Sequence, residues 1–461
     1  MVELFRRRLE GKTILLLGFG REGESSYQLI RELFPDQMLW IADRNPGIAG
    51  NILLTDDSNV TFQCGEDYLQ GLNRFDLILK SPGISLKDLK HPAEASKITS
   101  QTDIFLEIFW RQTIGITGTK GKSTTSSLIA HILNTGGRDS VLLGNIGTPA
   151  WHFFDRITPE TVVVDELSSH QLEYIRRGPH IALLLNIYEE HLDAYISYQH
   201  YQAAKMNIAT TQTSGDYLLY NADDPIIRSH ISSSPVLSSL IPMSLHLQYD
   251  VGAFRRNSEL VFRVPGREEL VVRDLHNRYL KGEHNLRNIM AAVAASWLQG
   301  VSEEAILDGL ASFKGLAHRM EYVGYYHNIH WVNDSIATIP EASVAAVQSL
   351  PEVDTLILGG FDRGISYEAF ARFLIDSQVR TLILVGDAGR RLGREIEKID
   401  ETIKERKNLF YINRFDHLLP LAVENTLHGT TCLLSPAASS YDEFRSFEER
   451  GFRFCELIKE K

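Results

Sequence analysis

A run of glycines, lysines and hydroxyl residues near position 120 has the composition of a phosphate-binding loop. The segment Gly115-Ile-Thr-Gly-Thr-Lys-Gly-Lys-Ser-Thr-Thr125 follows a short apolar stretch and precedes SSLIAHILNTGG, whose apolar residues recur at helical spacing. Glycines let backbone N–H groups approach phosphate oxygens, and a helix N-terminus favours negative charge. The layout therefore predicts a nucleoside triphosphate site in which Lys122 contacts phosphate and Ser123 binds magnesium.

This loop departs from the usual P-loop pattern, because GxxxxGK[ST] requires glycine at the position of Ile116. A GKS tripeptide alone is as often a chance match as a site. The flanking strand, the two further glycines and the helix make chance the weaker interpretation. The residues expected to bind ATP in this loop are Gly118, Thr119, Lys120, Gly121, Lys122, Ser123 and Thr124.

A second glycine loop, Gly18-Phe-Gly-Arg-Glu-Gly23, follows a strand and opens the helical segment ESSYQLIREL. Asp43 lies twenty positions beyond Gly23, after the apolar stretch LWIA. Read alone, this pattern is typical of a dinucleotide-binding fold and favours an NAD-dependent dehydrogenase. A lone GxGxxG is a weak signal, so other nucleotide-containing ligands stay open.

The composition restricts the class of protein. The chain has 461 residues, and 47 Lys plus Arg against 59 Asp plus Glu give a net charge of −12. An acidic chain is a poor candidate for nucleic-acid binding, so anionic ligands must be held by individually placed groups. Three cysteines without CxxC spacing argue against a disulfide framework and a zinc site. No apolar run is long enough for a signal peptide or membrane span, so we expect a cytoplasmic protein without membrane insertion.

The elements that must position these loops alternate between short strands and helical segments, which predicts an α/β fold with parallel sheets. Length suggests about three domains. We expect residues 1–105, 106–315 and 316–461 to form them. Strand-like runs lie at 12–18, 113–118, 161–166, 180–186, 354–360, 380–386 and 430–436. A stretch of more antiparallel character, around LVFRV and ELVVRDL, precedes the last three runs.

The variant loop TGTKGKSTT resembles the phosphate loop of the Mur ligases, the ATP-dependent amide-forming ligases of peptidoglycan precursor synthesis. Further segments occur in the order that the family shows: DELSSHQLE at 165–173, NIYEEHLDAY at 186–195, YQAAKMNI at 201–208, GEHNLRN at 282–288, HRMEYV at 318–323 and NDSIAT at 333–338. The resemblance covers nearly the whole chain. It implies a Rossmann-like N-terminal domain, a central P-loop ATPase-type domain and a Rossmann-like C-terminal domain, in a protein that acts as a monomer.

The resemblance implies that two magnesium ions assist phosphoryl transfer. Ser123 and Glu166 would bind one ion, and His191 and a carbamylated Lys205 the second. Carbamylation replaces a cation by an anionic oxygen ligand. From the residues alone, Lys205 would be a solvent-facing helix residue, His191 a structural histidine and Glu166 a helix-capping acid. With Lys122, these four residues are the expected catalytic set.

The resemblance also places the substrates. In the family, adenine lies near the positions of Asn285 and Asn288, and Arg319 and Asp334 reach ATP from the third domain. The first glycine loop would then hold the UDP of UDP-N-acetylmuramoyl-L-alanine instead of NAD. The residues expected there are Gly18, Gly20, Arg21, Gly23, Asp43, Ser81, Pro82, Gly83 and Asn145.

The C-terminal segment LLSPAASSYDEFRSFEERG and GNIGTPA are most similar to the glutamate-adding members of the family. The residues expected at the amino acid are Thr338, Arg363, Ser440 and Phe447. Those members carry two lysines where this chain has Ile336 and Arg363. Loss of such a cation weakens the binding of a substrate carboxylate, because burying a carboxylate without a cationic partner costs roughly several kcal/mol of free energy.

Several alternatives stay open. D-glutamate is the default substrate, although a variant that adds L-glutamate resembles this chain in its GREG loop and DSI segment. A catalytically idle paralogue that regulates cell-wall synthesis is a further alternative. So are ligases of the same fold that add other amino acids, which the C-terminal segment disfavours.

Overall fold

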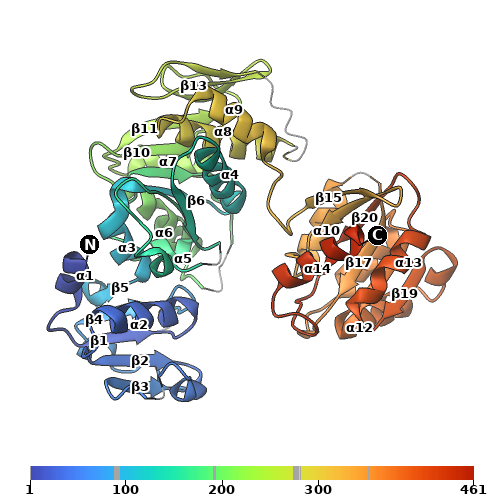
Figure 1. The fold of residues 1–461 in the computed structure, drawn as a ribbon, viewed down its shortest axis with the longest axis horizontal. Coiled ribbons are helices and arrows are strands. Elements are labelled where there is room, and N and C mark those ends of the chain that lie inside the picture. Colours follow the sequence, from blue (N-terminus) through green and yellow to red (C-terminus); the bar gives the residue numbers. More distant parts are fainter. Residues whose placement is uncertain are drawn as a thin grey trace. The chain divides into compact units, whose positions relative to one another are not determined.

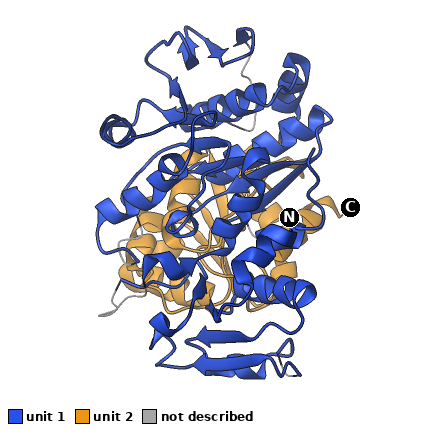
Figure 2. Cartoon of the chain, turned by 90° about the vertical axis from the view of Figure 1, so that its left-hand side faces the viewer, with its two compact units in different colours: residues 1–313 blue, residues 314–461 orange. Residues whose placement is uncertain are grey.

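The computed structural model describes residues 2–460 apart from 55, 88–93, 147, 191–193, 274–279, 281 and 351. The chain forms two compact units, residues 1–313 and 314–461, which Figure 2 shows in separate colours. Each contains parallel sheet flanked by helices, so the predicted α/β class is confirmed (Figure 1). Among the described helices, none combines the length and apolar content that a membrane span requires.

The first sheet lies at the N-terminus and has the order β3-β2-β1-β4-β5, with every pair parallel. This order matches one half of a Rossmann fold, whose ligands bind at the carboxyl ends of the strands. Its strands are β1 (Ile14–Leu17), β2 (Leu39–Asp43), β3 (Val60–Cys64), β4 (Leu77–Lys80) and β5 (Ile98–Thr99). Its helices are α1 (Val2–Leu9), α2 (Arg21–Leu33) and α3 (Gln101–Phe109), with 3-10 turns η1 (Pro46–Gly50), η2 (Leu72–Arg74) and η3 (Ala95–Lys97).

The second sheet has nine strands in the order β14-β13-β12-β11-β10-β9-β6-β8-β7. It is parallel from β7 to β12 and antiparallel from β12 to β14, as the sequence predicted. The strands are β6 (Thr113–Thr117), β7 (Ser140–Gly144), β8 (Val162–Glu166), β9 (Ile181–Leu184), β10 (Tyr217–Asn221), β11 (Ser239–Ser244), β12 (Gly252–Arg256), β13 (Glu259–Arg263) and β14 (Leu270–Val272). The helices are α4 (Lys122–Thr135), α5 (Ser169–Leu172), α6 (Tyr198–Thr210), α7 (Pro225–Ser233), α8 (Glu283–Leu298) and α9 (Glu303–Ser312), with η4 (Trp110–Gln112) and η5 (Ala150–Phe153).

The side chains of β9 alternate between the two faces of the sheet, and both faces are buried. Ile181 and Leu183 pack into the core beneath α4, α8 and α9, whereas Ala182 and Leu184 pack against α5 and α6. Successive side chains of a strand point to opposite faces, so a continuous apolar run is what a doubly covered strand needs. The sheet therefore fixes where the loops after β6, β8 and β9 emerge.

The first and second sheets share a continuous core. Apolar residues of β1, β2 and β4 belong to the same buried cluster as Trp151, Phe154 and residues of β7 and β8. The 1–105 and 106–315 division therefore stays a prediction, since these segments pack as one unit.

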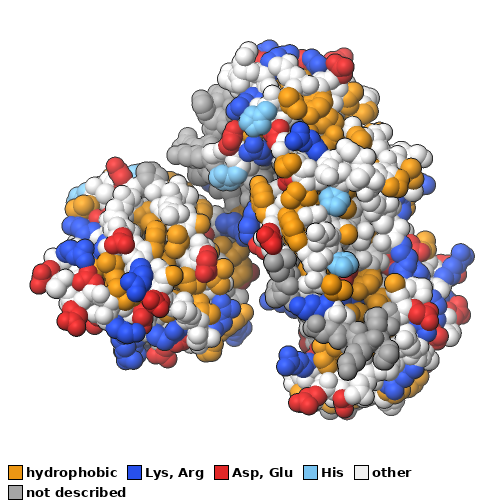
Figure 3. Space-filling model, turned by 180° about the vertical axis from the view of Figure 1, so that it is seen from behind, with side chains coloured by type: hydrophobic (Ala, Val, Ile, Leu, Met, Phe, Trp, Pro, Cys, Tyr) orange, Lys and Arg blue, Asp and Glu red, His pale blue; other side chains and the backbone are white. Residues whose placement is uncertain are grey.

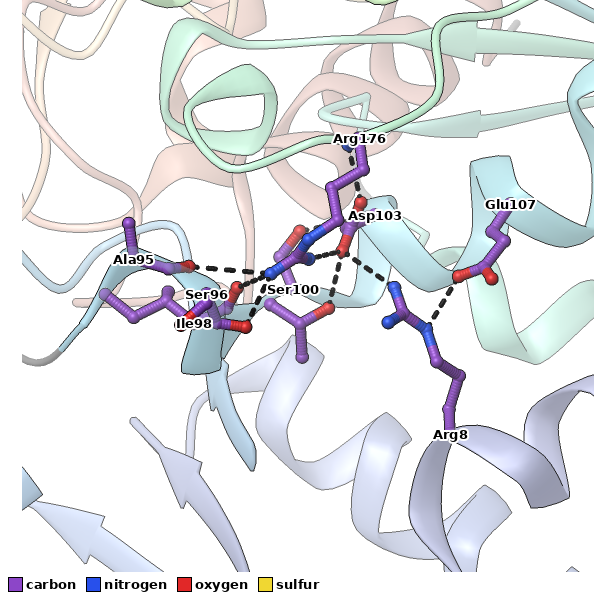
Figure 4. Close-up of polar contacts among 9 residues, drawn as sticks. Arg8, Ala95, Ser96, Ile98, Ser100, Asp103, Glu107 and Arg176 are labelled. Atoms are coloured by element: carbon purple, nitrogen blue, oxygen red, sulfur yellow. Dashed lines mark hydrogen bonds and ion pairs between the residues drawn. The ribbon is translucent and has the colours of Figure 1, made fainter. Parts of the chain in front are cut away.

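A polar cluster reinforces this junction (Figure 4). Asp103, on α3, is almost completely buried and accepts hydrogen bonds from the Arg176 backbone N–H at 2.7 Å and from its guanidinium. Arg176 also donates to the carbonyls of Ser96 at 3.0 Å and Ile98 at 2.7 Å. Arg8 of α1 reaches Asp103 at 3.5 Å. One carboxylate thus connects α1, α3 and the segment that follows α5.

Replacing Asp103 with Asn should lower the free energy of unfolding of residues 1–313 by about 2 kcal/mol, because the buried side chain at 103 loses its charge-assisted hydrogen bonds to Arg176 and Arg8. Urea unfolding measures this. Glu107→Gln is the matched control on the same helix, since Glu107 is partly exposed and pairs only with Arg8 among the contacts described here. Equal losses for the two variants would contradict the role assigned to Asp103.

The second unit contains a six-stranded sheet in the order β15-β16-β20-β17-β18-β19, parallel except for the β15–β16 pair. Its strands are β15 (Glu321–Tyr326), β16 (Ile329–Asn333), β17 (Val353–Gly359), β18 (Thr381–Val385), β19 (Asn408–Ile412) and β20 (Thr431–Leu434). Its helices are α10 (Pro340–Ser349), α11 (Glu368–Asp376), α12 (Gly386–Ile399), α13 (Leu418–Asn425) and α14 (Phe447–Lys459), with η6 (Ile403–Glu405) and η7 (Phe415–His417).

Candidate active site

The predicted phosphate loop connects β6 to α4. Gly121 precedes the helix with a φ of +88°, a conformation that glycine adopts without strain. A side chain there would also place its Cβ 2.4 Å from Asn288 Oδ1. The Lys122 ammonium folds back to donate to the carbonyls of Gly118 at 2.9 Å and Thr119 at 3.2 Å. The loop is therefore shaped to expose N–H groups and one cation.

Residues of the loop after β9 hold the phosphate loop in place. Asn186 accepts from the Lys120 backbone N–H at 2.8 Å and donates to the Lys120 carbonyl at 2.9 Å. The Thr119 hydroxyl lies 2.9 Å from the Tyr201 hydroxyl and accepts from the Tyr188 N–H. The sequence analysis missed Asn186 and Tyr188. Their only signal was their position directly after a buried strand.

A cavity of about 340 Å³ adjoins this loop. Asn288 lines it from α8, as expected of a residue near the base, and donates to Asn285 Oδ1 at 3.2 Å. Lys120 and Gly121 of the predicted loop also line it. The remaining lining residues had no predicted role, and they are Leu185, Asn186, Tyr188, Asn221, Met243, His284, Arg287 and Met290. An apolar cavity with a few amides suits a nucleotide base.

Glu166, the last residue of β8, lies beside β6 and is buried. Its Oε1 accepts from Asn145 Nδ2 at 2.9 Å, and its Oε2 is buried without a hydrogen-bond partner among the described residues. An unpaired buried carboxylate oxygen is costly unless a cation binds it. Ser123, in the first turn of α4, is the predicted companion ligand, and a hydroxyl with a carboxylate suits the hard magnesium ion.

Lys205 on α6 is only 2% exposed, so the solvent-facing alternative is wrong. Its ammonium donates to the Gly118 carbonyl at 3.0 Å, within the phosphate loop. Burial, reinforced by Lys122, lowers the pKa of Lys205 to about 7, although Glu190 opposes the shift. An amine that is readily neutral fits the chemistry of carbamylation, because carbon dioxide reacts with the unprotonated form.

His191 lies outside the described residues, so the second predicted metal site is untested. Within the described part of the chain, no group of three or more His, Cys, Asp and Glu residues could hold a metal ion. The predicted set contributes only Glu166 to such a search, since its other described members are a serine and a lysine. Both magnesium sites therefore stay predictions.

The N-terminal glycine loop lies at the carboxyl ends of β1, β2 and β4. Asp43 accepts from the backbone N–H groups of Phe19 at 2.7 Å and Asn45 at 2.8 Å, and Ser81 donates to the Gly18 carbonyl at 2.9 Å. A Cβ at Gly23 would lie 2.2 Å from the Gly18 carbonyl oxygen, whereas one at Gly20 would meet open space. Gly20 and the exposed N-terminus of α2, which carries Arg21, are thus the accessible part of this loop.

Glu22 in this loop is not directed outward. It accepts from Gln171 Nε2 at 3.0 Å, and burial raises its pKa to about 7, although Gln171 and Lys80 oppose the shift. Gln171 in turn accepts from the Ser168 N–H at 3.0 Å, two residues after Glu166. The sequence analysis assigned no role to Glu22, yet its side chain connects the glycine loop to the segment that follows β8.

The raised pKa predicts that stability falls as pH rises from about 4.5 to about 7. Over that interval the unfolded chain releases the Glu22 proton while the native state retains it, and above pH 7 the penalty is constant. The variant Glu22→Gln lacks this penalty. The difference in unfolding free energy between the variant and the wild type should therefore shift in favour of the variant by up to about 3 kcal/mol between pH 4 and pH 8. Chemical denaturation measures the unfolding free energy of both proteins at each pH. If the two curves of unfolding free energy against pH ran parallel, Glu22 would not be a buried ionisable group.

A second cavity, of about 710 Å³, lies between the turn after β4 and helices α5 and α6. Pro82 and Gly83, both predicted to bind the UDP substrate, line it. It is otherwise bordered by residues without a prior assignment, among them Tyr174, Glu173, His170, His200 and Asn207. Pro82 and Gly83 are the predicted site residues that line this cavity, and its other wall comes from α5, α6 and the segments beside them.

In residues 314–461, the predicted ATP ligands lie on the turns that flank β15 and β16. Asp334 is buried and accepts from Ser435 Oγ at 2.8 Å and from the Met320 N–H at 3.2 Å. Burial raises the pKa of Asp334 to about 6, against the opposing effects of these bonds and Arg319. Arg319 is exposed, as a phosphate ligand must be before its substrate binds.

The predicted amino-acid residues lie at the carboxyl ends of β16, β17 and β20 and at the start of α14. Arg363 donates to the Thr338 carbonyl at 3.0 Å, and Phe447 accepts from Ser335 Oγ at 2.8 Å. Ser440 is buried after β20. Beside it, the buried Ser439 hydroxyl lacks a partner among the described residues, a donor that the sequence analysis missed. Acidic and basic side chains are interspersed over the surface of this unit (Figure 3), which leaves anion binding to placed groups.

Comparisons with known proteins agree with this geometry. The Mur ligase middle domain matches residues 116–296. The UDP-N-acetylmuramoylalanine--D-glutamate ligase of Symbiobacterium thermophilum is 36% identical over 410 residues, 87% of each chain. The ligase of that name from Geobacillus kaustophilus is 34% identical over 461 residues, 98% of each chain.

Solved structures show the same fold. MurF from Acinetobacter baumannii superimposes with a TM-score of 0.55 at 17% identity, covering 78% of this chain and 79% of its own. UDP-N-acetylmuramate-alanine ligase MurC from Thermotoga maritima gives a TM-score of 0.51 at 18% identity over 96% and 98%. With relatives above 30% identity along nearly its whole length, the chain belongs to the Mur ligase family.

Proposed function

We propose that this protein joins D-glutamate to UDP-N-acetylmuramoyl-L-alanine and converts ATP to ADP and phosphate. The observation that carries the proposal is the similarity, along nearly the whole chain, to relatives named UDP-N-acetylmuramoylalanine--D-glutamate ligase. The phosphate loop, its adjoining cavity and the buried Lys205 beside Gly118 support it. We further propose that the protein acts in the cytoplasm, that it is a monomer, and that it has the three domains predicted from the sequence.

The reaction must avoid an uphill condensation in water. A carboxylate oxygen of the UDP substrate attacks the γ-phosphorus of ATP, and ADP leaves. The glutamate amine then attacks the acyl carbon, phosphate leaves and the amine loses a proton. Lys122 would stabilise the charge on the transferred phosphoryl group, and loop N–H groups would bind the remaining phosphates. Magnesium at Ser123 and Glu166 would neutralise further phosphate charge.

The relatives described above are named for D-glutamate, so the L-glutamate alternative has no support from them. The NAD-dependent alternative also has none. Both Asp43 oxygens already accept backbone N–H groups, one from Phe19 of the glycine loop and one from Asn45 after β2, which suits a residue that shapes a glycine loop for another nucleotide. Ile336 and Arg363 remain departures from the glutamate-adding members, and they make the amino-acid test decisive.

The test presents UDP-N-acetylmuramoyl-L-alanine and ATP with each glutamate isomer and follows phosphate release. We expect release with D-glutamate and background release with L-glutamate. Omission of the UDP substrate is the control and should abolish the signal. No stimulation by either isomer would refute the proposed function, and stimulation by L-glutamate alone would refute its stereochemistry.

A further inference from the structure

Arg450 on α14 is a buried cation whose contacts are almost entirely backbone carbonyls. It is 2% exposed. Its guanidinium donates to the carbonyls of Ser335 at 2.9 Å and Ala438 at 3.0 Å, with a longer contact to Gly359 at 3.5 Å, and its Nε donates to Ser335 Oγ at 3.0 Å. No carboxylate of the described residues forms an ion pair with it. An arginine buried in this way is unusual, because buried charges are normally paired.

The three carbonyls belong to three different strand ends. Ser335 follows β16, Gly359 ends β17 and Ala438 follows β20, and these strands are neighbours in the order β16-β20-β17. The loops that continue from them carry Thr338, Arg363 and Ser440, three of the four residues predicted to contact the amino acid. The fourth, Phe447, is bound to Ser335 Oγ. All four therefore lie on segments that Arg450 or its direct partner Ser335 holds.

We infer that Arg450 is a positioning residue for the amino-acid pocket: it turns the carbonyls of the three loops toward the core, away from the bound dicarboxylate. The inference rests on the proposed function for its substrate. Carbonyl oxygens that faced a carboxylate would repel it, and Ile336 supplies no cation to offset that repulsion. Holding the carbonyls inward leaves the exposed side of the loops to the cation of Arg363.

The close packing around the guanidinium supports a fixed geometry. A Cβ at Gly360 would lie 3.0 Å from Arg450 Nη1 and 2.3 Å from the Ser439 carbonyl oxygen. The Ser335 hydroxyl accepts from Arg450 and donates to Phe447, so both of its hydrogen-bonding functions are used. The guanidinium directs N–H donors from three nitrogens to three carbonyls and one hydroxyl. A lysine ammonium has three donors on a single nitrogen, so it cannot reproduce these four separated contacts.

The kinetic test uses the full-length variant Arg450→Lys. We expect the KM for glutamate to rise on the order of tenfold to a hundredfold, because the pocket loses its alignment. The KM values for ATP and the UDP substrate, and kcat at saturating glutamate, should stay within about twofold. Arg453→Met is the matched control on the same helix. Its side chain pairs at the surface with Asp416 and Glu460, so all constants should be unchanged.

A second measurement does not depend on the reaction. Amide hydrogen exchange of Arg450→Lys should show faster exchange in the 335–338, 359–363 and 438–440 segments together, with the rest of the sheet unchanged. If that variant does not fold, Ser335→Ala replaces it and should give a smaller change of the same kind. Unchanged exchange in these segments, or a loss of kcat with an unchanged KM for glutamate, would overturn the inference. Wild-type protein without glutamate-dependent turnover would instead refute the proposed function, while exchange still decides the role of Arg450.

Discussion

Replacing Lys122 with alanine should abolish ATP turnover, lowering it by on the order of a hundredfold to a thousandfold. Lys122 is the first residue of α4, and its ammonium already lies over the loop at 2.9 Å from the Gly118 carbonyl. Without that cation, the phosphates lose the charged group that the loop places beside Gly118, and the other predicted ligands do not replace it there. Phosphate release from ATP in the presence of both other substrates measures the effect.

The control for this variant is Lys398→Ala, which removes an exposed lysine from α12 that pairs with Glu395. It should leave turnover unchanged. Circular dichroism and thermal unfolding of Lys122→Ala should match the wild type, because the side chain is only partly buried. Turnover that survives the loss of Lys122 would show that the loop is not the ATP site.

Replacing Lys205 with methionine should reduce ligation by about a hundredfold or more, if a carbamylated Lys205 holds the second magnesium ion. The substitution retains a long unbranched side chain in the buried position and removes the amine. The amine attacks carbon dioxide, a C–N bond forms and a proton is released, which leaves an anionic carbamate. Removal of bicarbonate and carbon dioxide should therefore slow the wild-type enzyme, and their return should restore it.

Isotope-labelled bicarbonate tests the modification directly. The wild type should give a carbamate carbon signal by NMR that the Lys205→Met variant lacks. With a Lys205 pKa of about 7, about half of the amines are neutral at pH 7, so the signal should weaken as pH falls below that value. The carbamate would be excluded if the wild-type enzyme were fully active without carbon dioxide and gave no carbamate carbon signal. That conclusion would hold whatever the effect of Lys205→Met.

The sequence predicted the local features of the site well, because short-range patterns define them. The phosphate loop connects a strand to a helix as expected, and Glu166 ends β8 at the ligand-binding edge of the sheet. Glycines, strand-forming runs and helix starts encode these features within a few residues of one another. The family resemblance contributed the roles that no local pattern specifies.

Long-range contacts were beyond local patterns. Asn186 fixes Lys120 from 66 positions away, and nothing in the segment LLLNIYEE indicates that partnership. The helical pattern of YQAAKMNI did not show that Lys205 points inward, since both faces of α6 contain small or apolar residues. Arg450 was missed for the same reason: an arginine in a helix with many charged residues is usually exposed, and only the folded sheet shows the three carbonyls around it.

The contact between Gly121 and Asn288 has a consequence for sequence variation. Gly121 lies in the loop before α4 and Asn288 lies on α8, yet a single methyl group at 121 would occupy the space of the Asn288 amide. A larger residue at 121 would be strained at a φ of +88° and would also need a smaller residue at 288, which would give up a cavity-lining amide. Among divergent relatives, the two positions should change as a pair or not at all, so a mutational scan of single substitutions would underestimate the sequences compatible with this loop.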